Sequence, residues 1–139
     1  MIDDGELITT ALSHAARAHA GQTDKRGRPY IEHVTEVADA VHGQGAHTVA
    51  TAFLHDVLED TTHTDLSPYP PEVQEAVHAI TRKAGETYDD YIERVATNPI
   101  ARTVKLADLR LNHATAPEER LRTRYARAIA QLEQKDQLN

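Results

Sequence analysis

A cluster of ionisable side chains lies inside an apolar stretch at residues 53–60, and it constrains the fold most. Glu59 lies four residues after His55, and Asp60 four after Asp56, so we expect each pair to share a helix face. Burying such charges costs several kcal/mol unless a partner neutralises them. A divalent metal is one such partner, because it binds imidazole nitrogen and carboxylate oxygen. A surface pair or a helix cap is the alternative for an isolated His-Asp dipeptide.

Apolar residues recur three and four positions apart along almost the whole chain, as on one face of an α-helix. No stretch alternates cleanly between apolar and polar residues, so we predict no sheet. We therefore predict an all-α, compact bundle of six or seven helices, at about residues 6–20, 31–41, 47–60, 71–80, 87–95, 99–111 and 116–132.

Several helix starts carry local signals. Pro71 suits the first turn of a helix, where its missing N–H costs nothing. Thr87 is a candidate N-cap, and the Asn98-Pro99 pair marks another start. Thr115, followed by a proline and two glutamates, is the candidate N-cap of the last helix.

Composition excludes several classes of protein. The 139 residues suffice for a single domain, 1–139, with its core at about 7–132. The absence of cysteine excludes disulfides and thiolate metal sites. The formal net charge of −7 argues against nucleic acid as a partner. No apolar run approaches the ~18 residues of a membrane span, and the acidic N-terminus lacks a signal peptide's basic start. We expect a cytoplasmic protein without membrane partners; its oligomeric state is not predictable.

Two more candidate ligands flank the cluster. His33 lies 22 residues before His55, and Asp108 lies 52 residues after Asp56 in another apolar helix. As alternatives, His33 is a partly buried helix histidine, and Asp108 pairs with Lys105 at the surface. Asn112 shares a helix face with Asp108, where it would either orient a ligand or cap the helix C-terminus.

Glu59 and Asp60 are the candidate catalytic pair. If a metal lowers the pKa of a water molecule, a nearby carboxylate can take the proton or orient the attack; the alternative is a solvated helix end. The basic loop before His33, with Lys25, Arg26 and Arg28, would either meet substrate phosphates or remain solvated.

Four segments carry a family resemblance: residues 18–22, the run from Lys25 through Pro29 to His33, residues 54–61 and residues 104–108. Together they resemble the hydrolase domain of RelA/SpoT homologues, a branch of the HD phosphohydrolase superfamily. The size is similar to that of the stand-alone small alarmone hydrolases.

The resemblance implies an all-α HD fold with one bound Mn²⁺ per chain, Zn²⁺ and Fe²⁺ being competitors. It implies removal of the 3′ pyrophosphate of the nucleotide (p)ppGpp, an alarmone, to give GDP or GTP and pyrophosphate. Carried onto this sequence, the metal ligands are His33, His55, Asp56 and Asp108. The catalytic pair is Glu59 and Asp60, and the substrate-binding residues are Lys25 and Asn112.

The chain departs from the family at the base-recognition loop. The family commonly has an arginine there that packs on guanine, and Asp24 stands at this position, followed by Lys25. A carboxylate cannot replace a guanidinium stacked on a base. The family's C-terminal basic-plus-Tyr element is matched only loosely, by Arg122, Arg124 and Tyr125.

Two alternatives to a (p)ppGpp hydrolase stay open. One is an HD phosphohydrolase for another phosphorylated nucleotide or metabolite, which the Asp24 departure makes credible. The other is a non-catalytic nucleotide-binding regulatory domain, against which the retained Glu59 and Asp60 pair speaks.

Overall fold

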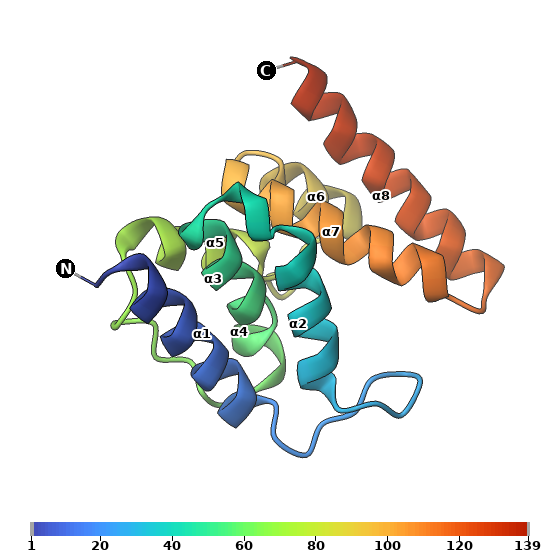
Figure 1. The fold of residues 1–139 in the computed structure, drawn as a ribbon. Coiled ribbons are helices and arrows are strands. Elements are labelled where there is room, and N and C mark those ends of the chain that lie inside the picture. The colour runs from blue at the N-terminus through green and yellow to red at the C-terminus, as the bar shows by residue number, and fades with distance from the viewer. Residues whose placement is uncertain (1, 139) are drawn as a thin grey trace.

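The computed structural model describes residues 2–138 of the chain, with side chains for residues 2–134, and within these residues the fold is all-α (Figure 1). Seven helices have eight residues or more: α1 (Asp4–Ala18), α2 (Tyr30–Ala40), α3 (Ala46–Leu54), α5 (Pro71–Ile80), α6 (Tyr88–Val95), α7 (Pro99–Thr115) and α8 (Glu119–Leu138). A 3-10 turn, η1 (His42–Gln44), and a single α-turn, α4 (Val57–Asp60), complete them. The predicted all-α class is confirmed.

Helix α3 lies at the centre of the core. Residues 48–54 of α3 are all buried, and the helix packs against α1, α2, α5 and α7. Its composition explains this position, because a helix that is apolar on every side is stable only when surrounded by other helices. Every helix that carries a candidate ligand is therefore α3 itself or a direct neighbour of it.

Most of the predicted helix starts are confirmed. Pro71 occupies the first turn of α5. The side chain of Thr87 accepts a hydrogen bond from the backbone N–H of Asp90, and the side chain of Asn98 accepts one from Ala101. These caps satisfy N–H groups that have no partner inside their own helix.

The predicted continuous helix at 47–60 is wrong, because it breaks at His55 and Asp56. The His55 Nδ1–H donates to the backbone carbonyl of Ala52 at 2.6 Å. That carbonyl would otherwise accept the N–H of residue 56 in the next helical turn. The chain bends at Asp56 (φ −110°, ψ 1°) and then forms the short α4. Glu59 and Asp60 thus lie on a separate turn from His55.

The predicted N-cap at Thr115 is also wrong. Thr115 is the last residue of α7, and its hydroxyl donates to the carbonyl of Leu111. Pro117 explains the boundary, since a residue before proline disfavours helical backbone, and Ala116 is extended (ψ 124°). Helix α7 therefore runs four residues beyond its predicted end, and α8 begins at Glu119.

The segment 21–29 is an ordered turn. Asp24 and Arg28 pair through their backbones, with the Asp24 N–H donating to the Arg28 carbonyl at 2.8 Å. Gly27, at φ +80°, closes the turn in a conformation that other residues rarely adopt. An isolated bridge between Thr23 and Pro29 leads the chain directly into α2.

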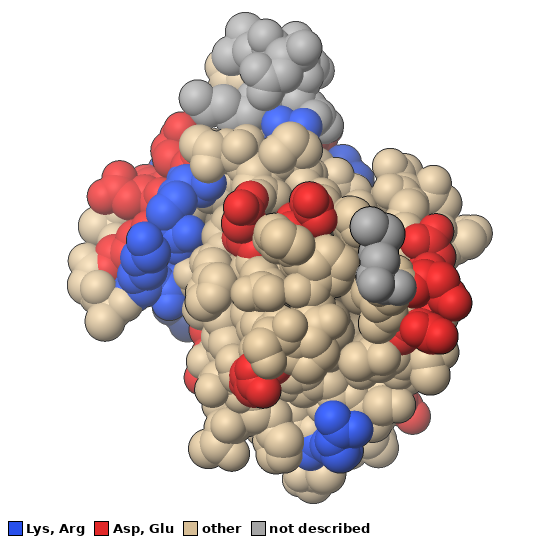
Figure 2. Space-filling model, turned by 90° about the vertical axis from the view of Figure 1, so that its left-hand side faces the viewer, with Lys and Arg blue, Asp and Glu red and all other residues tan. Residues whose placement is uncertain are grey.

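Helix α8 is the outermost element. It packs on α6 and α7, and its C-terminal end extends beyond the other helices (Figure 1). On the face shown in Figure 2, Lys and Arg gather in a band along the left edge beside Asp and Glu, and most of the face is uncharged. None of the described helices is long and apolar enough to cross a membrane.

Candidate metal centre

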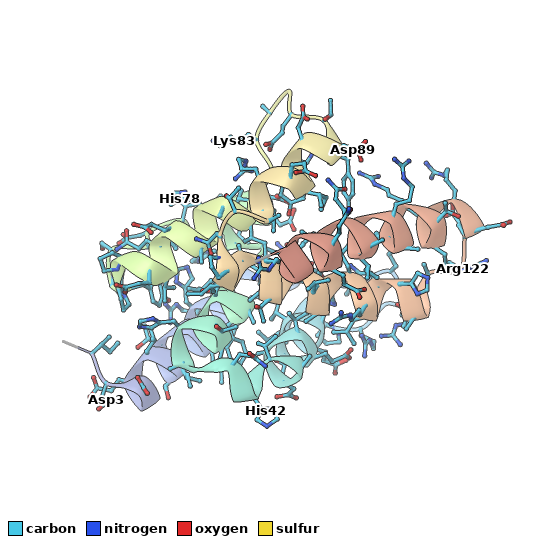
Figure 3. All side chains as sticks on the ribbon, turned by 90° about the horizontal axis from the view of Figure 1, so that it is seen from above. Asp3, His42, His78, Lys83, Asp89 and Arg122 are labelled. Carbon is cyan, nitrogen blue, oxygen red and sulfur yellow. The ribbon has the colours of Figure 1, made fainter. Side chains whose placement is uncertain are left out.

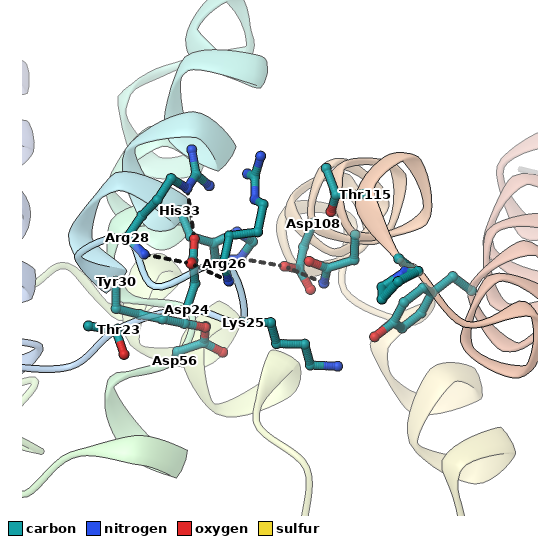
Figure 4. A pocket seen from close by; sticks show the side chains of 14 residues that line it. Thr23, Asp24, Lys25, Arg26, Arg28, Tyr30, His33, Asp56, Asp108 and Thr115 are labelled. Carbon is teal, nitrogen blue, oxygen red and sulfur yellow. Dashed lines mark hydrogen bonds and ion pairs between the residues drawn. The ribbon is translucent and has the colours of Figure 1, made fainter.

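Three of the predicted metal ligands meet at the core. His33 on α2, His55 at the end of α3 and Asp108 on α7 each offer one ligand atom, and these atoms lie within 4.8 Å of one another. All three side chains are buried, and in Figure 4 a dashed line joins His33 and Asp108 in the pocket. The His33 Nε2 lies 2.9 Å from Oδ1 of Asp108. Residues 75 positions apart are thus brought into hydrogen-bond contact.

Asp56, the fourth predicted ligand, lies outside this group of three but next to it. Its Oδ2 is 3.1 Å from Nε2 of His55 and accepts a hydrogen bond from the hydroxyl of Tyr30. Burial raises the pKa of Asp56, but the positive charge of His55 brings it down to about 2. The carboxyl group is therefore ionised and available as a ligand.

The tautomer of His55 suits a metal. Because Nδ1–H donates to the Ala52 carbonyl, Nε2 is the nitrogen that faces the carboxylates. That nitrogen lies close to Asp56 and Asp108 (3.1 and 3.6 Å) yet forms no aligned hydrogen bond with either. Buried polar atoms in folded proteins are nearly always satisfied. Close contacts without hydrogen-bond alignment, here between His55 Nε2 and the carboxylate oxygens of Asp56 and Asp108, are what a metal ion bound to all three atoms would produce.

The charges of the centre depend strongly on each other. Burial opposes the charged form of Asp108, but Lys105 and the two histidines hold its pKa well below the usual range. Burial likewise lowers the pKa of His55, but Asp56 and Asp108 raise it well above its usual value. Without a metal, the imidazolium form of His55 is the local counter-charge, and a divalent cation would replace that proton.

The donor set fits a divalent transition metal. Two imidazole nitrogens and carboxylate oxygens form a site of intermediate softness, and it contains no thiolate. His33, His55 and Asp108 would hold the ion, with Asp56 beside them. The structure brings these side chains together, and their role as ligands stays a prediction.

Glu59 and Asp60 lie on α4, beside the centre. Both residues are exposed, and the Oε1 of Glu59 accepts the backbone N–H of Arg82 at 2.5 Å. Although the residues are exposed overall, partial desolvation of the carboxyl groups and the negative charge of Asp56 raise the pKa of both carboxyls. A raised pKa makes a carboxylate a better proton acceptor near neutral pH.

The two predicted substrate-binding residues line the pocket that opens onto the centre. This pocket has a volume of about 490 Å³, and Lys25 and Asn112 line it together with His33, Asp56 and Asp108 (Figure 4). The Asn112 Nδ2–H donates to Oδ1 of Asp108 at 3.3 Å. The alternative that Asn112 caps its helix is wrong, because α7 continues to Thr115.

Asp24 turns inward and organises its own loop. Its Oδ1 accepts the N–H groups of Arg26 and Arg28, and its Oδ2 accepts Nε of Arg28 at 2.9 Å. Burial opposes ionisation, yet these hydrogen bonds keep the pKa of Asp24 below its usual value. Arg28 also pairs with Glu36 at 2.6 Å, so its charge is shared by carboxylates. Asp24, Arg26 and Arg28 all line the pocket.

The sequence reasoning missed two residues near the centre, Tyr30 and His19, and expected a third, Lys105, to pair with Asp108 only at the surface. Tyr30 holds Asp56, and the ammonium of Lys105 lies 3.1 Å from Oδ2 of Asp108 in a buried pair. The rings of His19 and Tyr30 are in contact, tilted by 46° with centroids 4.9 Å apart, and the buried Nε2 of His19 has no hydrogen-bond partner among the described residues. The available signal was the position of Tyr30 and Lys105 three residues from a predicted ligand, on the same helix face.

The three residues of the C-terminal element, Arg122, Arg124 and Tyr125, make different contacts. Arg122 donates to the carbonyl of Ala116 at 2.9 Å and so fastens the turn between α7 and α8. The guanidinium of Arg124 lies over the ring of Tyr88, 3.8 Å from its centroid. Of the three residues, only Tyr125 lines the large pocket.

The fold and the centre define the class: an all-α bundle with histidine and carboxylate donors gathered at its core. Residues 11–98 match the model of the HD domain family, and the chain belongs to this family. His33, His55, Asp56, Glu59 and Asp60 all lie within the matched segment.

Curated relatives place the chain near the RelA/SpoT proteins. It is 33% identical over 116 residues to a probable GTP pyrophosphokinase of Mycobacterium leprae, covering 73% of this chain. It is 30% identical over 132 residues to the GTP pyrophosphokinase of Myxococcus xanthus, covering 81% of this chain. The matched parts are only 15% and 17% of those two proteins.

The fold is also similar to that of a solved structure described as a metazoan orthologue of SpoT that hydrolyses ppGpp. The TM-score is 0.72 at 23% identity, over 91% of this chain and 84% of that one. The predicted resemblance to RelA/SpoT-type HD domains is confirmed.

Proposed function

We propose that this chain is a metal-dependent (p)ppGpp 3′-pyrophosphohydrolase that releases GDP or GTP and pyrophosphate. The observation that supports it is the convergence of His33, His55 and Asp108 within 4.8 Å. Their centre opens into a pocket of about 490 Å³, large enough for a nucleotide. Mn²⁺ is the proposed ion, with Zn²⁺ and Fe²⁺ as competitors for the same donors.

Each group of residues has a proposed part in the reaction. A divalent metal held by His33, His55, Asp56 and Asp108 supplies Lewis acidity toward a phosphoryl oxygen and lowers the pKa of a water molecule. Glu59, fixed through Oε1 by the Arg82 N–H, has Oε2 to accept a proton from the attacking water. The ammonium of Lys25 binds a phosphate at the mouth of the pocket.

The names of the relatives do not decide between synthesis and hydrolysis for this chain. They describe much longer proteins, in which the matched segment is 17% of the length or less. The metazoan orthologue of SpoT, which is described as hydrolysing ppGpp, matches this chain over most of its length. The hydrolytic reaction is therefore the proposal.

A second candidate is hydrolysis of another phosphorylated nucleotide or metabolite. One observation favours it: Asp24, at the position of a base-packing arginine, lines the pocket with a carboxylate that is bound by Arg26 and Arg28, so it offers no cation to pack on a base. Guanine recognition by this loop would then differ from that of the relatives.

A substrate screen separates the two candidates. The purified chain, loaded with Mn²⁺, is incubated with (p)ppGpp, nucleoside mono-, di- and triphosphates and NADP-type dinucleotides, and pyrophosphate and orthophosphate are measured separately. Pyrophosphate from (p)ppGpp alone supports the first proposal. Orthophosphate from other compounds, with (p)ppGpp inert, supports the second, and the absence of any hydrolysis contradicts both.

A further inference from the structure

The two carboxylate oxygens of Asp108 have different partners, and Lys105 binds one of them. Its Nζ lies 3.1 Å from Oδ2, whereas Oδ1 faces His33 Nε2 at 2.9 Å and Asn112 Nδ2 at 3.3 Å. Lys105 precedes Asp108 by one turn of α7, so the helix itself sets this geometry. Only Oδ1 is turned toward the two histidines.

The ammonium of Lys105 is enclosed. Its side chain is 15% exposed, and Nζ lies 5.4 Å from the centroid of the Tyr91 ring. Tyr91 is fixed in turn, because its hydroxyl donates to the carbonyl of Ile80 at 2.5 Å. The ammonium of Lys105 is therefore held in a fixed position between Asp108 and Tyr91.

We propose that Lys105 is a positioning residue of the metal centre: it reserves one oxygen of Asp108 for the metal and keeps the loaded centre positively charged. Asp56 and Asp108 together balance the charge of a divalent ion, and Lys105 adds one further positive charge. This surplus suits an anionic phosphate ligand. The inference rests on the proposed metal-dependent function and assigns a role to a residue that does not line the pocket.

This role predicts opposite effects on metal and on substrate. Replacing Lys105 by an uncharged residue frees Oδ2 for ligation and removes a like charge beside the ion, so both changes tighten metal binding. The same replacement lowers the positive charge that attracts a phosphate, so anion binding weakens. A merely structural lysine would instead weaken both, because its loss would disorder the site.

The test compares Lys105→Met with the parent and with Lys83→Met, which removes an exposed lysine in the loop before α6 (Figure 3). Mn²⁺ affinity is measured from the electron paramagnetic resonance signal of the free ion. Pyrophosphate binding to the Mn²⁺-loaded protein is measured by calorimetry. We expect Lys105→Met to tighten Mn²⁺ binding roughly tenfold and to weaken pyrophosphate binding by a similar factor, with Lys83→Met like the parent.

Two results would overturn the proposed role of Lys105, and a second variant replaces Lys105→Met if that protein does not fold. Unchanged or weaker Mn²⁺ binding in Lys105→Met overturns the inference while leaving the metal-dependent function intact. A parent chain that binds no Mn²⁺ overturns both. If Lys105→Met does not fold, Lys105→Gln is measured in the same way, because glutamine can still donate to Asp108 but carries no charge; it too must bind Mn²⁺ more tightly than the parent.

Discussion

At the scale of single residues, His55 has two separate tasks on its two ring nitrogens. Its Nδ1–H donates a hydrogen bond to the carbonyl of Ala52, which ends α3, and its Nε2 faces Asp56 and Asp108. The hydrogen bond that breaks the helix therefore also fixes the tautomer that a metal requires. Local structure and site chemistry depend on the same side chain.

His55→Ala is expected to abolish metal binding. The parent should retain about one transition metal ion per chain, and the variant close to none, because the central nitrogen donor is lost. Elemental analysis after Mn²⁺ loading and desalting is the measurement. His42→Ala, which removes an exposed histidine at the edge of the molecule (Figure 3), is the control and should keep the metal. Equal metal content in all three proteins would remove the basis for this centre.

Glu59→Gln is expected to lower turnover by roughly 10²–10⁴, the usual scale of general acid–base catalysis. The glutamine oxygen can still accept the Arg82 N–H, so α4 should keep its position and the protein its metal. Turnover and metal content are measured on the same preparation, with Glu72→Gln on α5 as the matched surface control. Activity within a few-fold of the parent would mean that Glu59 only fastens α4 to the loop after α5.

At the scale of elements, the connections place the site as much as the helices do. The turn at 21–29 carries Lys25 to the pocket, and the segment after α5 reaches α4 through the contact between Arg82 and Glu59. Each connection is fastened by one carboxylate, Asp24 in the first and Glu86 in the second. A substitution of Asp24 should therefore loosen the first connection, and a substitution of Glu86 should loosen the second.

Asp24→Arg is expected to raise the Michaelis constant for (p)ppGpp roughly fivefold, on the scale of a lost hydrogen-bond anchor. The variant loses the acceptor for the N–H groups of Arg26 and Arg28, and the loop that carries Lys25 is no longer held. Asp24→Asn keeps one oxygen acceptor and should have a smaller effect. Steady-state kinetics with both variants is the measurement, and a lower Michaelis constant in Asp24→Arg would show that an arginine here binds the base directly.

Glu86 should make stability depend on pH in acid. Its carboxylate receives Nε of Arg94 at 2.8 Å and the backbone N–H of Lys83 at 3.0 Å, and these hydrogen bonds lower its pKa from 4.5 to about 2. A depressed pKa in the folded state stabilises the fold above pH 4.5, and this stabilisation is lost as the pH falls to about 2.

Thermal unfolding at pH 6 and pH 2 tests this dependence. The melting temperature of the parent should exceed that of Glu86→Gln at pH 6, and the difference should shrink at pH 2. Glu75→Gln on the outer side of α5 is the control. A difference that is equal at both pH values would show that the charge of Glu86 does not contribute.

At the scale of the whole molecule, much of the account could be predicted from the sequence. The spacing of apolar residues predicts the bundle. The grouping of His33, His55 and Asp108 was predicted from the family resemblance, and the packing of α2, α3 and α7 explains it. The break at His55 could not be predicted, because it depends on which carbonyl an imidazole reaches. The burial of Lys105 could not be predicted either, because it requires Tyr91 of α6 to lie beside α7.

The most direct test of the central claim is the product balance of (p)ppGpp hydrolysis in the presence and absence of metal. The parent chain with Mn²⁺ should release one pyrophosphate for each GDP or GTP formed, chelation should abolish the reaction, and His55→Ala should show none. Guanine nucleotides and pyrophosphate are quantified in one reaction by ion-exchange chromatography. Orthophosphate as the product, or hydrolysis that persists equally in His55→Ala, would contradict the account.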